Sequence, residues 1–463
     1  MAPDTVNSNS NGSSKRKPVA FAYCEGSPSW NPDAYLADAE LHARAEAHLA
    51  NNDLRSAITT SFSLRKTDTY VYHAIVAVTL PQAQQVVSLG AARGLHGWYY
   101  SEPSPSPSPS SPSLPSPAPP ATTTRRPTPP VRLPPPPQPD VEAYLSIFLP
   151  SNSAPTALRN LAANAKKGSL RREIGTYLTT KRFVHPALPA LVIPRVKRPS
   201  PPFPSNPYLA FQAWASRNLE WAGPGPSSAR GPSSSHHVLP ILMHHFGCAC
   251  PSHEALEILR LLADGREIID VGSGNGYWTR LLRDYHAFHA APNASKPTSN
   301  TPPASSSVVP LVTPVDSAQS SWRTTWVSDT LIADGAAYLR TTRRGARDAV
   351  LLLVYPIVGG GVAGGTEGGF TRRMLDAYDG DTVAVVGTQN HNGYTGFRHM
   401  TTDEFMAREH DDWVKVVQVP LPSFPGKDEA LYVFQRGPRA PPRQGDETRA
   451  REPLDQGRQE ENT

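Results

Sequence analysis

The chain of 463 residues carries 51 prolines, most of them in runs with serine that bury too little apolar surface to offset the entropy of ordering. The net charge of +5 is spread along the chain rather than clustered, which disfavours a nucleic-acid-binding face. Three cysteines argue against a disulfide framework and favour a reducing compartment, and no stretch reaches the ~18 apolar residues of a membrane span.

The N-terminal hundred residues divide into a tail and a mixed segment. Residues 1–20 are predicted to be a disordered tail without the apolar core of a secretory signal. The basic run KRKP at 15–18 is either a nuclear localisation signal or an ordinary feature of such a tail, so we expect a cytoplasmic or, alternatively, nuclear protein. Residues 21–100 are predicted to be a mixed helical segment, in which TYVYHAIVAVTL (69–80) is either a strand or a buried helix.

A proline- and serine-rich linker, residues 101–140, is predicted to be extended and semi-rigid. Its PxxP spacings make an SH3-like partner an alternative to a plain spacer. Residues 141–265 carry apolar residues at helical spacing and are predicted to be mainly helical, with a role in substrate specificity or as a lid. In the last of these helices, Ser252 is the expected N-cap and Gly265 the expected C′ residue.

From residue 266 to residue 437, short apolar strands alternate with helices. This alternation predicts an α/β fold with a doubly wound, mostly parallel, seven-stranded sheet, in which the last two strands form an antiparallel pair at the edge. The predicted strands are 266–271, 308–316, 330–335, 348–356, 381–387, 413–421 and 429–437. Residues 287–309 are predicted to be a low-complexity insertion, and residues 438–463 a disordered tail.

The sequence IIDVGSGNGYW places three glycines between the first of these strands and a helix. Glycine permits positive φ and close approach of a ligand to the backbone, and the N–H groups at a helix start attract an anion. Gly272, Gly274 and Gly276 follow Asp270, but Tyr277 stands where the dinucleotide pattern G-x-G-x-x-G has its third glycine. The pattern therefore disfavours an NAD-dependent oxidoreductase, which stays a second alternative.

A second acid follows the next predicted strand. Asp316 comes 46 residues after Asp270, a spacing that falls to 23 when the 23 residues of 287–309 are left out. An acid about 20 residues after the first strand typically binds a ribose diol. A carboxylate accepts two hydroxyl hydrogen bonds well and tolerates a 2′-phosphate badly, so we expect an adenosine-type ligand without that phosphate.

This combination resembles motif I of the class I S-adenosylmethionine-dependent methyltransferases, over about residues 266–437. The resemblance implies S-adenosyl-L-methionine as the cofactor, with the turn Gly272–Gly276, including Ser273 and Asn275, around its methionine part. It further implies that Asp316 and Ser317 hold the ribose, and that Asp334, followed by Gly335, meets the adenine amino group. LLVYP at 352–356 matches the family's fourth motif, beside the methyl group, but lacks the D/N-P-P-Y/F of enzymes that methylate planar amino nitrogens.

Two side chains are candidates for a catalytic base, which methyl transfer needs only when the acceptor loses a proton. They are Tyr355 and His391, the latter alternatively an ordinary loop residue. His244 and Cys248 have a spacing that could hold a metal, but C-x-C is not a zinc knuckle, and we predict no metal site. The segment 236–250 is more readily a core helix or a lid, and the glycine-rich 359–370 a surface or substrate loop.

The sequence thus predicts methyl transfer to an unidentified small molecule or protein. An inactive methyltransferase-like scaffold, which acts through its proline-rich segments, remains an alternative. No membrane association is expected, and nucleic acid is an unlikely acceptor because no basic face is evident.

Overall fold

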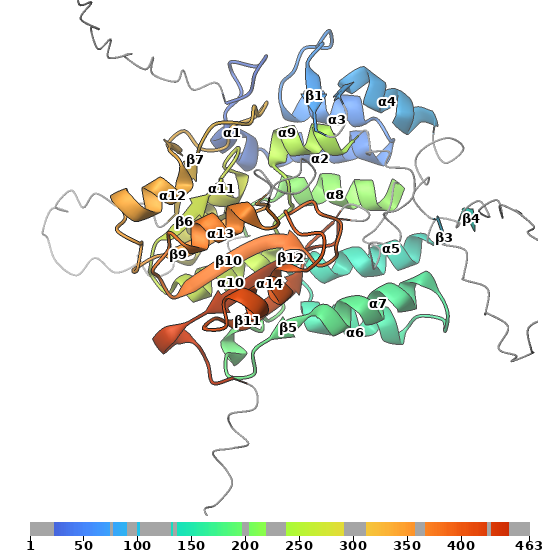
Figure 1. The fold of residues 1–463 in the computed structure, drawn as a ribbon. Coiled ribbons are helices and arrows are strands. Elements are labelled where there is room, and N and C mark those ends of the chain that lie inside the picture. Colours follow the sequence, from blue (N-terminus) through green and yellow to red (C-terminus); the bar gives the residue numbers. More distant parts are fainter. Residues whose placement is uncertain are drawn as a thin grey trace, which may run out of the picture.

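The computed structural model describes residues 23–74, 77–89, 100–101, 131–132, 137–196, 203–218, 238–290, 312–356, 366–423 and 427–443. Its centre is a mixed eight-stranded sheet with the order β5-β11-β12-β10-β9-β6-β7-β8 (Figure 1). The tail 1–20, most of the linker 101–140 and most of the insertion lie outside the described residues. In the described part of the chain, no helix is long and apolar enough to cross a membrane.

Five strands of the sheet run parallel, and β12 runs against its neighbours β10 and β11. The parallel strands are β6 (Ile268–Val271), β7 (Val312–Asp316), β8 (Leu331–Ile332), β9 (Val350–Val354) and β10 (Thr382–Thr388). The remaining strands are β11 (Val414–Pro420), β12 (Glu429–Gln435) and β5 (Phe183–Val184). Strands β6, β9 and β10 are buried almost throughout, as their continuous apolar runs predict.

The sheet differs from the prediction at one edge. All seven predicted strands are present and the last two are antiparallel, but the sheet has eight strands. The additional strand is β5, which pairs with β11 through Val184 and Val417, so that the terminal pair does not lie at the edge. A strand of two residues is too short to show the strand periodicity in the sequence. β5 is a strand only because it pairs with the free edge of β11.

Helices cover both faces of the sheet. α10 (His253–Ala263) and α11 (Tyr277–Ala290) pack on the face of Ile268. The opposite face, that of Ile269 and Val271, is covered by α12 (Gly335–Ala337) with the π-helical turn Tyr338–Thr342, α13 (Gly369–Leu375) and α14 (Thr402–Glu409). The predicted N-cap is confirmed at Ser252, and Thr401 forms a capping box with Glu404 at the start of α14. Because α11 continues to Ala290, the first four residues of the predicted insertion are helical.

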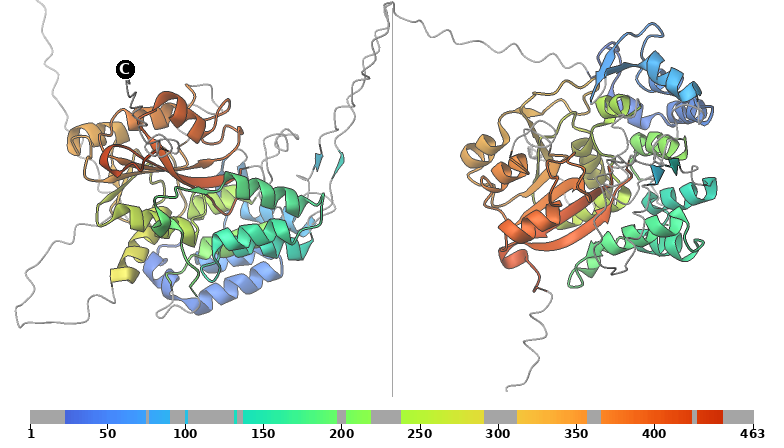
Figure 2. Two further views of the ribbon diagram at one scale, coloured as in Figure 1. Left: turned by 90° about the horizontal axis from the view of Figure 1, so that it is seen from below. Right: turned by 45° about the vertical axis from the view of Figure 1, so that its right-hand side comes forward.

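The N-terminal part of the chain packs on the α10–α11 side of the sheet (Figure 2). One hydrophobic core runs from Cys24 to Val433, so residues 23–89 share the core of the α/β region. The described part of 69–80 contains two short antiparallel strands rather than one strand or helix. The elements here are α1 (Pro32–Ala37), α2 (Ala39–Ala50), α3 (Leu54–Ser61), β1 (Val71–His73), β2 (Ala77–Thr79), α4 (Leu80–Leu89), α8 (Pro207–Asn218) and α9 (Leu239–Phe246).

A smaller helical core precedes α8. Tyr144, Leu158 and Leu178 pack together from three helices. These are α5 (Gln138–Leu145), α6 (Ala154–Ala163) and α7 (Leu170–Lys181), so the predicted helical region begins just before residue 141. Short elements complete the described chain: the strand pair β3 (Tyr100–Ser101) and β4 (Val131–Arg132), and 3₁₀ turns at Ser146–Phe148, Pro189–Leu191 and Gly437–Arg439.

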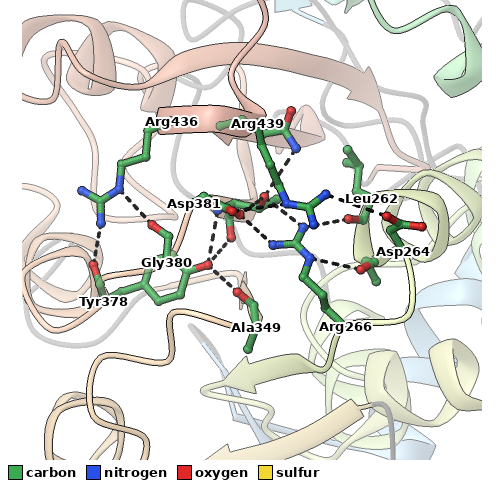
Figure 3. Close-up of polar contacts among 12 residues, drawn as sticks. Leu262, Asp264, Arg266, Ala349, Tyr378, Gly380, Asp381, Arg436 and Arg439 are labelled. Atoms are coloured by element: carbon green, nitrogen blue, oxygen red, sulfur yellow. Dashed lines mark hydrogen bonds and ion pairs between the residues drawn. The ribbon is translucent and has the colours of Figure 1, made fainter.

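Polar contacts join the amino ends of the parallel strands (Figure 3). Arg266, just before β6, places Nη1 2.6 Å from Asp381 Oδ1, just before β10. The Tyr378 hydroxyl lies 2.6 Å from the carbonyl oxygen of Ala349, before β9. Arg439, inside the predicted C-terminal tail, pairs with Asp381 at 3.2 Å, so the chain is anchored there beyond residue 437. These contacts lie at the amino ends of the parallel strands, opposite the carboxyl ends, where α/β sheets bind ligands.

Arg182 pairs with Glu254 and thereby joins the end of α7 to the start of α10, with only 11% and 8% of the two side chains exposed. We expect Arg182→Met to lower the free energy of unfolding by about 3 kcal/mol, because it leaves a buried carboxylate without its cation. Urea denaturation measures the change. Arg347→Met is the control, since its pair with Asp379 is 77% and 53% exposed and should contribute under about 1 kcal/mol. Equal losses in the two variants would contradict the expectation.

Candidate functional site

A cavity opens where the strand order reverses. β7 and β8 lie on one side of β6, and β9 and β10 lie on the other, so the carboxyl ends of β6 and β9 border the crevice in which α/β sheets bind ligands. The cavity has a volume of about 270 Å³, close to the lower end of the range typical of ligand pockets. Its walls are the turn 272–275, the loop 316–322, the start of α12, the end of β9 and the end of α9.

The three glycines of the turn after β6 all have positive φ, at 78°, 58° and 80°. A Cβ on Gly276 would lie 2.3 Å from Val327 Cγ2, and one on Gly274 would lie 3.0 Å from Trp322 Cζ2. Packing within the protein therefore requires these two glycines whether or not a ligand is bound. Gly272 is less crowded, with Phe370 Cζ at 3.4 Å, and faces the cavity.

Asp316 lies beside this turn, as the sequence predicts. Its Oδ2 accepts a hydrogen bond from the Gly274 N–H at 2.9 Å, and its Oδ1 accepts one from the Ala318 N–H at 2.6 Å. The carboxylate is partly buried and lines the cavity together with Ser317. Each carboxylate oxygen can accept a further hydrogen bond, so the group can still bind two hydroxyls.

Asp334 and Gly335 line the same cavity from the start of α12. Asp334 caps this short helix by accepting from the Ala337 N–H at 2.9 Å, and it pairs with Arg373 Nη2 at 2.7 Å. The backbone hydrogen bond from Ala337, with the help of Arg373, holds the pKa of this carboxyl below its usual value, so it is an anion at neutral pH. Packing requires glycine at position 335, since a Cβ on Gly335 would lie 2.3 Å from Val271 Cγ1.

Other residues of the predicted set play different parts. Ser273 lines the cavity, and its hydroxyl has no hydrogen-bond partner in the described chain. Asn275 also lines the cavity, but its side chain donates to the carbonyl oxygen of His245 at 3.1 Å and so fixes α9. Asp270 and Gly276 do not line it. Asp270 is fully buried and accepts from the Thr279 hydroxyl at 2.7 Å, because its position in β6 directs it toward α11.

The two candidate bases fare differently. Tyr355 lines the cavity and has a φ of 55°, a conformation that side chains other than glycine rarely adopt outside functional or constrained sites. Burial raises the pKa of its phenol well above the usual value, and Lys427 Nζ lies 4.4 Å from the ring centroid. His391 is exposed, lies 3.4 Å from Glu404 Oε2 and does not line the cavity. The geometry therefore favours a neutral Tyr355 and gives His391 no contact with the site.

Several residues of the cavity wall were not predicted from the sequence. They come from segments far from the glycine turn: His73, Met243, Trp322, Phe370 and Arg373. The end of α9 also contributes His244. Almost all of α9 is buried, in agreement with the core-helix interpretation of 236–250. The Nε2 of His244 lies 2.7 Å from the carbonyl oxygen of His73, and burial lowers its pKa. In the described chain no three His, Cys, Asp or Glu side chains group as they would around a metal.

Comparisons of the chain with models of protein families, with curated proteins and with solved structures found no match. The interpretation of the cavity therefore depends on the residues that line it.

Asp270 should make stability depend on pH. Burial raises the pKa of this carboxyl from 3.8 to about 7, so its stabilising contribution is complete below pH 3.8 and is lost as pH rises toward 7. Asp270→Asn should shrink the stability difference between pH 5 and pH 7.5 by roughly 2 kcal/mol, measured by urea denaturation. Part of the difference should persist, because burial likewise raises the pKa of Asp428 to about 7. Asp411→Asn, at an exposed position, is the control, and an unchanged pH profile of Asp270→Asn would refute the expectation.

Proposed function

We propose that the chain binds S-adenosyl-L-methionine in this cavity and transfers its methyl group to an acceptor. One observation carries the proposal. The glycine turn after β6, Asp316 after β7 and Asp334 after β8 line one cavity at the point where the strand order reverses. The sequence places these three features far apart, and an adenosine-type ligand needs them together.

The arrangement of the sheet supports the same proposal. Without β5, seven strands remain, with β6 at the switch and β12 antiparallel between β10 and β11. Helices cover both faces. This agrees with the doubly wound, seven-stranded fold and terminal strand pair that the resemblance to class I methyltransferases implies.

The residues of the cavity fit the proposed cofactor. Asp316 would hold the ribose hydroxyls and Asp334 the adenine amino group. The backbone of Gly272 and the free hydroxyl of Ser273 would border the methionine part. Asp316 already accepts from Gly274, so the site is arranged before any ligand enters, which lowers the entropy cost of binding.

The bound cofactor supplies an electrophilic methyl group on a sulfonium. The chain has to align the acceptor with it and to exclude water, and alignment alone can supply about 7–11 kcal/mol of the barrier. Tyr355 stands at the end of β9, where the resemblance expects the methyl group, and is held there by its Lys427 contact. Because its phenol stays neutral, it would orient the acceptor rather than remove a proton. The acceptor is proposed to be a small molecule or a protein.

A second candidate is a scaffold without activity. It is favoured by the packing of Trp322 and Val327 on Gly274 and Gly276, which gives these glycines a structural role. The oxidoreductase alternative is weaker. Tyr277 occupies the position of the third glycine, and its hydroxyl donates to Asn206 at 2.8 Å inside the core.

Calorimetric titration of the full chain with S-adenosylmethionine, S-adenosylhomocysteine and NAD tests the proposal. We expect a dissociation constant on the order of micromolar for the first two and no binding of NAD. The full chain is needed because residues 23–89 share the core and β1 contributes to the cavity wall. A folded chain that binds none of the three would favour the scaffold.

Gly274→Val should abolish binding of S-adenosylhomocysteine, because the new side chain would enter the space between the turn and Trp322. Gly265→Val is the matched control. Gly265 also has positive φ, at 78°, but a Cβ there meets nothing within 4 Å. Both variants should lose about 1–2 kcal/mol of stability from backbone strain, and Gly274→Val should lose more because of its contact with Trp322. Only Gly274→Val should lose binding by calorimetry. Normal affinity of Gly274→Val would overturn the assignment of the turn.

A further inference from the structure

The side chain of Arg323 is a buried cation directly behind the cavity wall. It follows Trp322, is 2% exposed and does not itself line the cavity. Its Nη1 and Nη2 lie 2.7 and 2.6 Å from the two carboxylate oxygens of Asp68, a two-bond geometry that fixes direction as well as distance. The guanidinium also stacks on the Tyr70 ring, with 4.4 Å to the centroid.

The hairpin that follows Asp68 extends these contacts to α9. Arg323 Nη1 donates to the Tyr72 hydroxyl at 3.0 Å, and that hydroxyl lies 3.0 Å from His245 Nε2. The other ring nitrogen of His245 lies 2.8 Å from Oγ1 of Thr324, which is the residue after Arg323. The polar groups around the guanidinium are thus connected to one another by polar contacts. They come from β1, α9 and the loop after β7.

The loop 322–327 is held on two sides. On one side, Arg323 accepts at its carbonyl oxygen from the Glu25 N–H at 2.8 Å, and the Thr325 N–H donates to Tyr23 at 2.7 Å. On the other side, the Trp326 N–H donates to the carbonyl oxygen of Asn275, in the glycine turn, at 2.8 Å. The N-terminal segment and the glycine turn therefore both bind this loop through backbone hydrogen bonds.

Trp322 is the point where the loop reaches the cavity. Its side chain is partly buried, lines the cavity and would meet a Cβ on Gly274 at 3.0 Å. Arg323 is the next residue, so the backbone that carries the fixed guanidinium also carries Trp322.

We propose that the Asp68–Arg323 pair is a clasp by which the N-terminal part of the chain positions the cavity wall 316–322 and thereby sets its affinity for the nucleoside ligand. The part of the proposal that concerns affinity rests on the proposed function. The positioning half, that the pair positions the wall 316–322, does not. Arg323 is a positioning residue, since it acts through Trp322 and the loop. Asp68 comes from a segment 255 residues away in the sequence, so the site is complete only when both parts of the chain fold together.

Asp68→Asn tests the clasp, because it keeps the shape of the side chain and removes its charge. Two measurements are needed: amide hydrogen exchange of residues 316–327 in the unliganded full chain, and the dissociation constant for S-adenosylhomocysteine. We expect exchange to become about 10-fold faster and affinity to fall about 10-fold, within the usual range of coupling between sites. Arg323→Lys, which keeps the charge without the two-bond geometry, should give smaller changes of the same sign.

Glu254→Gln is the matched control. It neutralises the buried acid partner of Arg182, which does not line the cavity. We expect it to lower stability as Asp68→Asn does and to leave both the exchange of 316–327 and the affinity unchanged. Equal effects of the two variants on exchange and affinity would mean that the pair contributes only general stability, and would overturn the clasp.

The remaining outcomes separate the clasp from the proposed function. If the unaltered chain binds no S-adenosylhomocysteine, the proposed function fails, and hydrogen exchange alone decides the positioning half. Unchanged exchange in Asp68→Asn overturns the clasp, and faster exchange with unchanged affinity overturns its link to binding. Should Asp68→Asn fail to fold, Arg323→Lys, which breaks the two-bond geometry with Asp68, takes its place, and the same two measurements apply.

Discussion

Parallel pairing on both sides of β6 is the constraint on which the rest of the structure depends. β6 pairs with β7 and with β9, and a chain that joins parallel strands has to cross over a face of the sheet each time. These crossings place α11 on one face and α12 on the other. They also place the turn after β6, with a crevice beside it, at the carboxyl ends of the strands. Contacts such as Arg266–Asp381 join the amino ends.

A buried charge sets the second constraint. Arg323 cannot lose its proton, and a guanidinium at 2% exposure is stable only with a partner. Its partner, Asp68, belongs to the segment 21–100, which the sequence predicts to be a mixed helical segment before the proline-rich linker. The pair therefore makes the N-terminal part of the chain a structural component of the cavity, together with His73 and the end of α9.

In the proposed reaction, the cavity positions the reactants rather than transferring a proton. Burial favours the neutral forms of His244 and Tyr355, and the hydrogen bonds of Asp334 favour its anion. These three groups thus do not change their charge near neutral pH. Such a site suits a displacement whose electrophile arrives already activated, for which alignment and exclusion of water are the main requirements.

The sequence by itself determined the features that depend on neighbours along the chain. Continuous apolar runs predicted the buried strands, and the glycines after Asp270 predicted the turn. Asp316 followed from its spacing after Asp270, whereas Asp334 followed only from the family resemblance. The tertiary structure alone decided which of these features meet and what else joins them. It added β5, placed β12 between β10 and β11, turned Asp270 away from the cavity, left His391 outside it and brought in Trp322 and His73. The physical reason is that these outcomes depend on contacts between segments as far apart as Asp68 and Arg323, and no local pattern of residues encodes which buried charge finds which partner.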